Sequence, residues 1–322
     1  MSNRTLIVVD GSAILYRAFH AIPLFTAPDG TPTNAVYGFI KMLLSLSDKF
    51  KPEFLSVALD TPKPTFRKKL LPSYQAQRPK APDELIIQIP LIEKFLKKAQ
   101  ISYYSKAGYE ADDVIGSIVK TQNKPGLNTY VITGDKDMLQ LVDSRITVVM
   151  PIKGVSILNY YDKDKVKEKF GITPDQIIDY KALMGDPSDN YPGVKGIGPK
   201  TATGLLERYQ TLESVYKNLE QIGGRTSKLL KQHQEDAWLS QELARIRIDL
   251  KTGFSFKKSR CQTKKPSPEL IEFLKRLGLY SIEKQLIKKS DSSLRSRQSQ
   301  SSIGQIKSKQ VDKNKKNQLS FF

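Results

Sequence analysis

The sequence predicts an α/β fold in which a largely parallel, twisted sheet is followed by a smaller helical region. Short runs rich in apolar and β-branched residues alternate with longer segments whose apolar residues recur at helical spacing. Such alternation is typical of strands joined by helical connections, and a run as uniformly apolar as LIVV is typical of a sheet covered on both faces. After about Gly171 the helical patterns continue, with no convincing run of strands.

Taken in order, the predicted strands are 5–9, 54–59, 129–133 and 146–150. Helical spacing lies between them, at 36–44 and again at 86–96. The segment 61–82 is rich in Pro, Lys and Arg and follows a strand, so we expect an exposed insertion over the end of the sheet. We therefore expect a core at 1–171, with this insertion and its following helix at about 61–96, and a helical region at 172–287.

The last part of the chain, 288–322, is rich in Ser, Gln and Lys and has few aliphatic residues. Such a segment has too little apolar surface to form a core, which predicts a disordered basic tail.

The chain has 322 residues and a net charge of +19, from 52 Lys and Arg against 33 Asp and Glu. This excess favours a polyanionic partner, nucleic acid before an anionic membrane. No stretch approaches the ~18 apolar residues of a spanning helix, and the N-terminus lacks a signal peptide's apolar core, so we expect a soluble cytoplasmic protein. One Cys and two His exclude an intramolecular disulfide and disfavour a zinc site, so any metal is expected to have oxygen ligands.

Acidic residues follow three predicted strands: Asp10 ends LIVVD, Asp60 ends FLSVALD, and Asp135 and Asp137 follow YVITG. In parallel sheets ligands bind beyond the carboxyl ends of the strands, so we expect these side chains to meet at one edge.

Five more acids lie in two short motifs. They are Glu110, Asp112 and Asp113 in YEADDVIGS, and Asp186 and Asp189 in GDPSDN. Within a helix Glu110 and Asp113 would share a face and Asp112 would point away, so all three face one centre only if Glu110 precedes the helix.

Each acid alone is more typical of an ordinary turn or helix cap. Together, such carboxylates would repel one another unless cations lay between them. Two Mg²⁺ ions about 3.5–4 Å apart, or Mn²⁺ in their place, suit these ligands and would support phosphodiester hydrolysis.

Two basic segments indicate contact with phosphates. The insertion combines cations with aromatic residues on which a base could stack, and GVKGIGPKTA combines flexible glycines with lysines. The candidate DNA-binding residues are Lys68, Lys69, Lys80, Gly193, Lys195, Gly196, Gly198, Lys200 and Thr201. The alternatives are a solvated charged face for the insertion and a plain Gly-rich helix connection for the second segment.

Five segments resemble the 5′-nuclease domain of bacterial DNA polymerase I and, more distantly, the flap endonucleases. They are DGSAILYRAFHAIP, DTPKPTFRKKLLPSYQAQRP, GYEADDVIGS, VITGDKDMLQLV and GDPSDNYPGVKGIGPKTA. The resemblance implies a PIN-like nuclease core with a helical arch at the insertion. It also implies a helix-hairpin-helix region at 172–287 that grips duplex DNA, often around a K⁺ ion.

The resemblance also implies roles for single residues. Asp10, Asp60, Glu110 and Asp112 correspond to ligands of the first metal, and Asp113, Asp135, Asp137, Asp186 and Asp189 to the second set. Arg67, Tyr74 and Arg78 occupy arch positions that contact the strand near the scissile phosphate, as catalytic residues. Gln75 departs from the family, because many relatives have Lys there, and the loss of that cation predicts some loss of rate.

The final residues Gln318, Leu319, Ser320, Phe321 and Phe322 resemble the bacterial sliding-clamp motif. Together the motifs predict a free-standing, monomeric 5′-3′ exonuclease and 5′-flap endonuclease of the bacterial cytoplasm and nucleoid. It would act on flaps, nicks and RNA primers. The alternatives are a non-catalytic DNA-binding factor and a ribonuclease with a similar acidic pocket.

Overall fold

The computed structural model describes residues 4–154, 156–261 and 265–290. The chain divides into two compact units. One is formed by 1–25 with 32–261, and the other by 26–31 with 262–322. The larger unit contains the sheet and every predicted acidic site residue.

The larger unit is built on a six-stranded sheet of order β3-β2-β1-β4-β5-β6. Its strands are β1 Arg4–Asp10, β2 Phe54–Ala58, β3 Ser102–Tyr104, β4 Leu127–Ile132, β5 Ile146–Lys153 and β6 Ile157–Tyr161. Neighbouring strands are parallel except for the antiparallel edge strand β6. The predicted parallel α/β fold is therefore confirmed.

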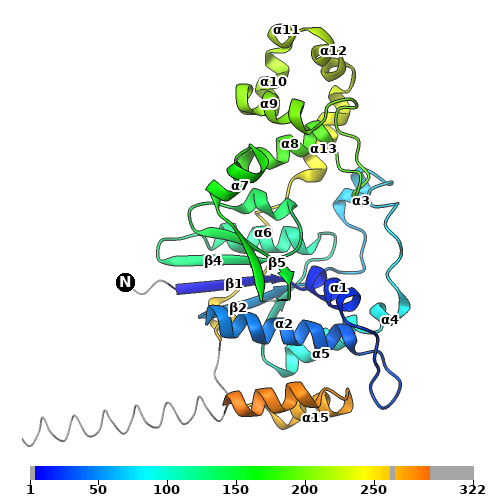
Figure 1. Cartoon of the computed structure of the whole chain (residues 1–322), viewed down its shortest axis with the longest axis vertical. Helices are drawn as coiled ribbons and strands as arrows, with labels where there is room; N and C mark the ends of the chain where they lie inside the picture. The colour runs from blue at the N-terminus through cyan, green and yellow to red at the C-terminus, as the bar shows by residue number, and fades with distance from the viewer. Residues whose placement is uncertain (1–3, 155, 262–264, 291–322) are drawn as a thin grey trace, which may run out of the picture. The chain divides into compact units, whose positions relative to one another are not determined.

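Helices connect the strands, cover the sheet and follow it along the chain (Figure 1). Those of the sheet region are α1 Gly11–Ala21, α2 Asn34–Phe50, α3 Phe66–Leu70, α4 Asp83–Ile86, α5 Ile89–Lys98, α6 Ala111–Thr121, the 3-10 helix η1 Asp137–Leu141 and α14 Phe256–Ser259. The second group comprises α7 Lys163–Phe170, η2 Pro174–Gln176, α8 Ile177–Met184, α9 Pro199–Tyr209, α10 Leu212–Lys217, α11 Leu219–Ile222, α12 Gly224–Gln232 and α13 Gln234–Ala244.

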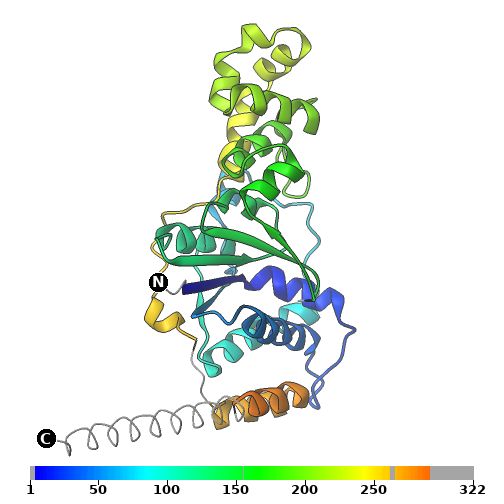
Figure 2. The ribbon, with the colours of Figure 1, turned by 60° about the vertical axis from the view of Figure 1, so that its left-hand side comes forward.

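The core forms on both faces of the sheet because β1 is apolar at consecutive positions. Leu6 and Val8 belong to the same buried cluster as the apolar residues of α6. Ile7 and Val9 are also fully buried and, by the alternation of a strand, face the opposite side. Figures 1 and 2 show α2 and α5 on that side and α6 on the other. Burial on both faces fixes the strand ends at one edge.

The basic insertion is only partly helical. After α3 the chain runs through turns and irregular backbone until α4 begins at Asp83. The following helix α5 belongs to the core layer, since Ile92 and Phe95 are buried on it. The exposed part of the predicted arch is therefore the short segment around α3 and the turns that follow it.

In the helical region, two backbone segments meet at Gly185 and Gly193. Both have positive φ angles, +71° and +59°. A Cβ on Gly193 would lie 2.0 Å from the backbone nitrogen of Gly185. Only glycine fits both positions, so the turn after α8 and the start of GVKGIG are packed backbone to backbone.

In the smaller unit, α15 Pro268–Arg276 begins at Ser267, whose hydroxyl accepts a hydrogen bond from the amide of Leu270. Among the helices of the described ranges, none is long and apolar enough to cross a membrane.

We expect Gly193→Ala to lower the free energy of unfolding by at least about 2 kcal/mol, because it combines a left-handed backbone with a backbone clash. Gly204→Ala is the control, since a Cβ there meets nothing within 4 Å. In the helix interior it should raise stability by about 0.5–1 kcal/mol. Urea unfolding measures both, and wild-type stability of Gly193→Ala would contradict the packing described.

Candidate metal centre and nucleic-acid interface

The carboxyl ends of β1 and β4 are joined by Thr133. The buried carboxylate of Asp10 accepts hydrogen bonds from Ala13 N at 2.9 Å and from Thr133 Oγ1 at 2.8 Å. Thr133 Oγ1 in turn accepts a bond from Asp135 N at 3.0 Å, and Asp135 Oδ1 accepts one from Asp137 N at 2.8 Å. The acids after two neighbouring strands are thus brought to one place, as the parallel sheet requires.

The acids after β2 and before α6 meet in the same way. Asp60 Oδ1 accepts a hydrogen bond from Ala111 N, the first residue of α6, at 2.7 Å. Glu110 is the N-cap residue and so precedes the helix, which is the condition set by the sequence for all three acids to face one centre. Glu110 and Asp112 do share a pocket with Asp60, whereas Asp113 does not line it.

This acidic pocket has a volume of about 730 Å³. Its lining includes seven of the nine predicted acids, Asp10, Asp60, Glu110, Asp112, Asp135, Asp137 and Asp189. The three predicted arch residues Arg67, Tyr74 and Arg78 also line it, together with Gln75. Residues from distant parts of the sequence therefore share one site at the edge of the sheet.

Asp186 joins the site through its neighbours. Carboxylate oxygens of Asp137, Asp186 and Asp189 lie within 4.8 Å of one another, close enough to hold a metal ion. The ammonium of Lys181, on α8, forms ion pairs with both Asp137 and Asp186. The sequence reasoning missed Lys181. The sequence feature that could have indicated it is the position of this lysine, one helical turn before Gly185 and Asp186, which follow α8.

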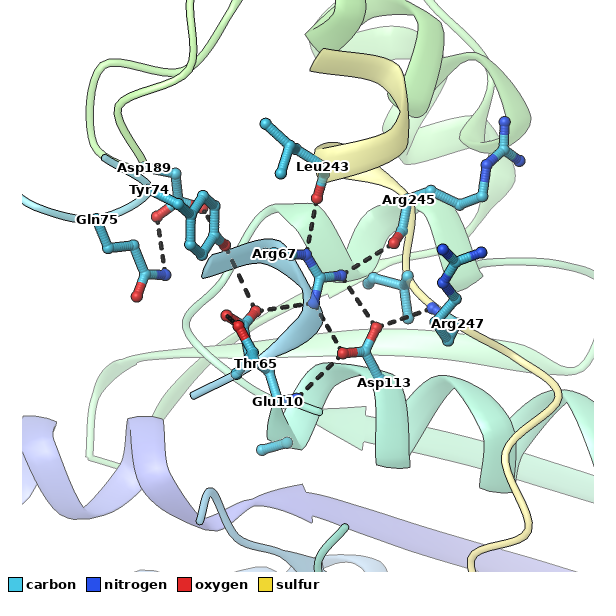
Figure 3. A network of polar contacts seen from close by, with 12 residues as sticks. Thr65, Arg67, Tyr74, Gln75, Glu110, Asp113, Asp189, Leu243, Arg245 and Arg247 are labelled. Atoms are coloured by element: carbon cyan, nitrogen blue, oxygen red, sulfur yellow. Dashed lines mark hydrogen bonds and ion pairs between the residues drawn. The ribbon is translucent and has the colours of Figure 1, made fainter. Parts of the chain in front are cut away.

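Arg67 lies at the centre of a buried polar network (Figure 3). Its guanidinium forms a bidentate pair with Asp113, at 2.7 and 3.0 Å, and a bond to Glu110 Oε2 at 3.0 Å. It also donates to the carbonyl oxygens of Leu243 at 2.8 Å and Arg245 at 2.9 Å. All five N–H donors of this side chain are thus used, and only 3% of it is exposed.

Asp113 neither lines the acidic pocket nor belongs to the group of Asp137, Asp186 and Asp189. Its side chain is fully buried, and besides Arg67 it accepts bonds from Glu110 N at 3.1 Å and Arg247 N at 2.9 Å. With four donors around its two oxygens, this carboxylate is the counter-ion of Arg67 in the structure. Glu110 and Asp113 lie on the same side, as their spacing predicts, but both side chains bind the guanidinium of Arg67.

The turn after α3 is attached to Asp189. Tyr74 Oη donates to Asp189 Oδ2 at 3.2 Å, Gln75 Nε2 to Oδ1 at 3.2 Å and Arg78 Nη2 to Oδ1 at 2.6 Å. The backbone amide of Gln75 also donates to Asp189 O at 2.9 Å. Arg78 is the exposed member, with 52% of its side chain accessible. Gln75 thus contributes a neutral donor to this acid.

The burial of so many acids raises their pKa values. Burial, opposed by hydrogen bonds and reinforced by Asp60 and Asp135, raises the pKa of Asp10 to about 7. Burial raises the pKa of Glu110 to about 7 even though Arg67 lies beside it, and that of Asp137 to about 6. Burial and four neighbouring acids hold the pKa of Asp112 well above its usual value. The negative charge here is only partly compensated.

The predicted basic residues lie on the surface. Lys68, Lys69, Lys80, Lys195 and Lys200 are exposed, and Thr201 is half-buried in the first turn of α9. Gly196 and Gly198 are exposed as well, whereas Gly193 is buried and its amide donates to Ser240 Oγ at 2.9 Å. The predicted clamp-binding residues Gln318, Leu319, Phe321 and Phe322 lie outside the described residues.

The donors in the acidic pocket fit hard divalent cations. They are carboxylates with no soft ligand among them, and burial together with neighbouring acids raises the pKa of Asp10 and Asp112. Asp10, Asp60, Glu110, Asp112 and Asp135 line this pocket together, and Asp137, Asp186 and Asp189 are close enough to hold an ion between them.

Solved structures with the same fold include a T5 5′-exonuclease with bound divalent metal ions (zinc). It is 20% identical, with a TM-score of 0.62 over 89% of this chain and all of that one. The catalytic core of Rad2 in complex with a DNA substrate is 14% identical, with a TM-score of 0.58 over 90% and 92% of the two chains.

The sequence comparisons are more specific. A 5′-3′ exonuclease of Aquifex aeolicus is 39% identical over 286 residues, which are 88% of this chain and 96% of that protein. DNA polymerase I of Bacillus subtilis is 42% identical over 248 residues, 77% of this chain but 28% of that much longer protein.

Two family models match in succession and confirm the resemblance seen in the motifs. The N-terminal resolvase-like domain of 5′-3′ exonucleases matches residues 5–171, and their C-terminal SAM fold matches residues 172–269. By these matches, and by its likeness to the Aquifex aeolicus enzyme along nearly the whole length of both, the chain belongs to the 5′-3′ exonuclease family.

Proposed function

We propose that this protein is a metal-dependent 5′-3′ exonuclease and 5′-flap endonuclease that hydrolyses phosphodiester bonds in DNA. The observation that carries the proposal is the acidic pocket, in which seven family acids lie together with exposed Arg78 at the rim. The substrates would be DNA with 5′ flaps, nicks or RNA primers. Family membership, rather than the pocket, supports the 5′-3′ direction.

Two divalent ions, Mg²⁺ or Mn²⁺, would supply an activated water and stabilise the leaving 3′ oxygen. The chain's own residues do the rest. Arg78, Lys68, Lys69 and Lys80 would bind phosphates of the strand near the pocket. Arg67 would act indirectly, by holding the carboxylate of Glu110 in place. The exposed turn of Gly196 and Gly198, with Lys195 and Lys200, would bind duplex phosphates, and a K⁺ ion at this turn stays a prediction.

Three further points remain proposals. The protein would act as a monomer on the bacterial nucleoid, and residues 318–322 would bind the sliding clamp. The sequence QLSFF supports the clamp contact, since its apolar side chains suit a preformed groove.

We expect Asp135→Asn to lower cleavage of a labelled 5′-flap duplex in Mg²⁺ by at least about 100-fold, because it removes a ligand and its negative charge. Binding of the same duplex should persist, since the basic surface is intact. The exposed Asp164→Asn is the control. Normal turnover by Asp135→Asn would refute the site.

The same assay on the wild type distinguishes the alternative functions. A protein that binds the flap without cutting it is a DNA-binding factor, and one that cuts only single-stranded RNA is a ribonuclease.

We expect Mg²⁺ to raise the melting temperature more at pH 8 than at pH 5. Folding raises the pKa of Asp10 and Glu110 to about 7, so between about pH 4 and pH 7 the folded protein keeps protons that the unfolded chain has released. Without metal, the free energy of unfolding therefore falls as the pH rises through this range. Asp112→Asn should therefore raise the metal-free melting temperature at pH 8 and reduce the Mg²⁺ effect. Glu207→Gln, an exposed change of equal charge, should do neither. Equal Mg²⁺ effects at both pH values would contradict this.

We expect substitution of Arg67 to affect stability and substitution of Arg78 to affect DNA binding. Arg67→Met leaves the fully buried Asp113 without its cation, so we expect a loss of about 3–5 kcal/mol in stability. Arg78→Met should leave the melting temperature nearly unchanged. It should weaken binding to flap DNA and reduce the salt dependence by about one phosphate contact. Thermal unfolding and DNA titration at several salt concentrations test the pair, and equal destabilisation by both changes would be against it.

A further inference from the structure

Lys181 is the one lysine whose ammonium lies among the acids of the pocket region in the described residues. It extends from α8 and forms ion pairs with Asp137, which follows β4, and with Asp186, which follows α8. The three side chains are 18%, 14% and 12% exposed. An ammonium thus bridges two of the three acids whose oxygens are close enough to hold a metal ion.

The third acid of this group also has a cation from the chain. Asp189 is paired with Arg78 at 2.6 Å. The other half of the pocket is different, because the described residues include no ion pair from Lys or Arg to Asp10 or Asp60. Asp10 is held by a threonine hydroxyl and a backbone amide, and Asp60 by a backbone amide and none of the basic side chains. The acids of one half are therefore each paired with a basic side chain, whereas in the other half, among the described residues, only Glu110 has such a partner, Arg67.

We propose that Lys181 is an internal counter-ion of the second metal site, which it fills until a divalent cation displaces it. This inference rests on the proposed function. An ammonium and a divalent cation repel each other and cannot share the same carboxylate oxygens of Asp137 and Asp186. The second ion must break both ion pairs, whereas at the first site the only paired acid is Glu110, whose partner Arg67 is also held by the buried Asp113. The two metals therefore bind in order, the second more weakly.

The lysine can make this exchange without movement of the helix. Its charge sits at the end of a flexible four-carbon chain, so the ammonium can withdraw while α8 stays packed. Whatever attracts the ammonium away from the two acids strengthens binding of the second ion, because linked equilibria are reciprocal. A DNA phosphate is such a group, so substrate would favour completion of the metal site that cuts it.

The test is calorimetric titration of the full chain with Mn²⁺ in the absence of DNA. For the wild type we expect two binding steps. In Lys181→Met the second step should become about tenfold tighter, equivalent to about 1.4 kcal/mol, and the first should not change. Lys120→Met is the matched control, since Lys120 is a partly buried lysine paired with Asp143 at 2.9 Å and its loss removes the same charge. Both steps should be unchanged in this control.

A second step that is equal or weaker in Lys181→Met would overturn the proposal, since the lysine would then be irrelevant or would position the acids. If Lys181→Met does not fold, Lys181→Gln takes its place, because it keeps a hydrogen-bond donor without the charge. The same tightening of the second Mn²⁺ binding step is expected. Failure of the proposed function would look different, because the wild type itself would bind no Mn²⁺ and leave flap DNA uncut.

Discussion

The architecture of the site depends on the repulsion between carboxylates that the parallel sheet forces together. Strands running in one direction deliver Asp10, Asp60 and Asp135 to one edge, and α6 adds Glu110 and Asp112. Backbone amides and hydroxyls orient these groups but carry no full charge. A fold that concentrates negative charge in this way is complete only with cations, and the chain provides some of them itself.

Those internal cations connect parts of the chain that are far apart in sequence. Arg67 ties the start of the insertion to α6 and, through the carbonyls of Leu243 and Arg245, to the end of α13. Arg78 ties the same insertion to the loop that carries Asp189. The basic insertion is thus not an independent arm on the surface. Arg67 at its base is buried, and the exposed Arg78 is paired with Asp189.

Much of this follows from the sequence. The four apolar runs are strands, and the rule that strand ends meet at one edge brings together Asp10, Asp60 and Asp135. The two strands that were missed, β3 and β6, lie at the sheet edges, where half-exposed residues blur the apolar signal. The roles of Asp113 and Lys181 depend on which distant side chains they meet, and local periodicity carries no information about that.

The backbone contact between Gly185 and Gly193 has a consequence for how a substrate is measured. Asp186 follows the first glycine directly, and the turn that we propose to bind duplex phosphates begins at the second. With no side chain between them, the two segments are in direct backbone contact. Under the proposed function, the distance between the place where a duplex is held and the place where a strand is cut would therefore depend on main-chain packing at this junction.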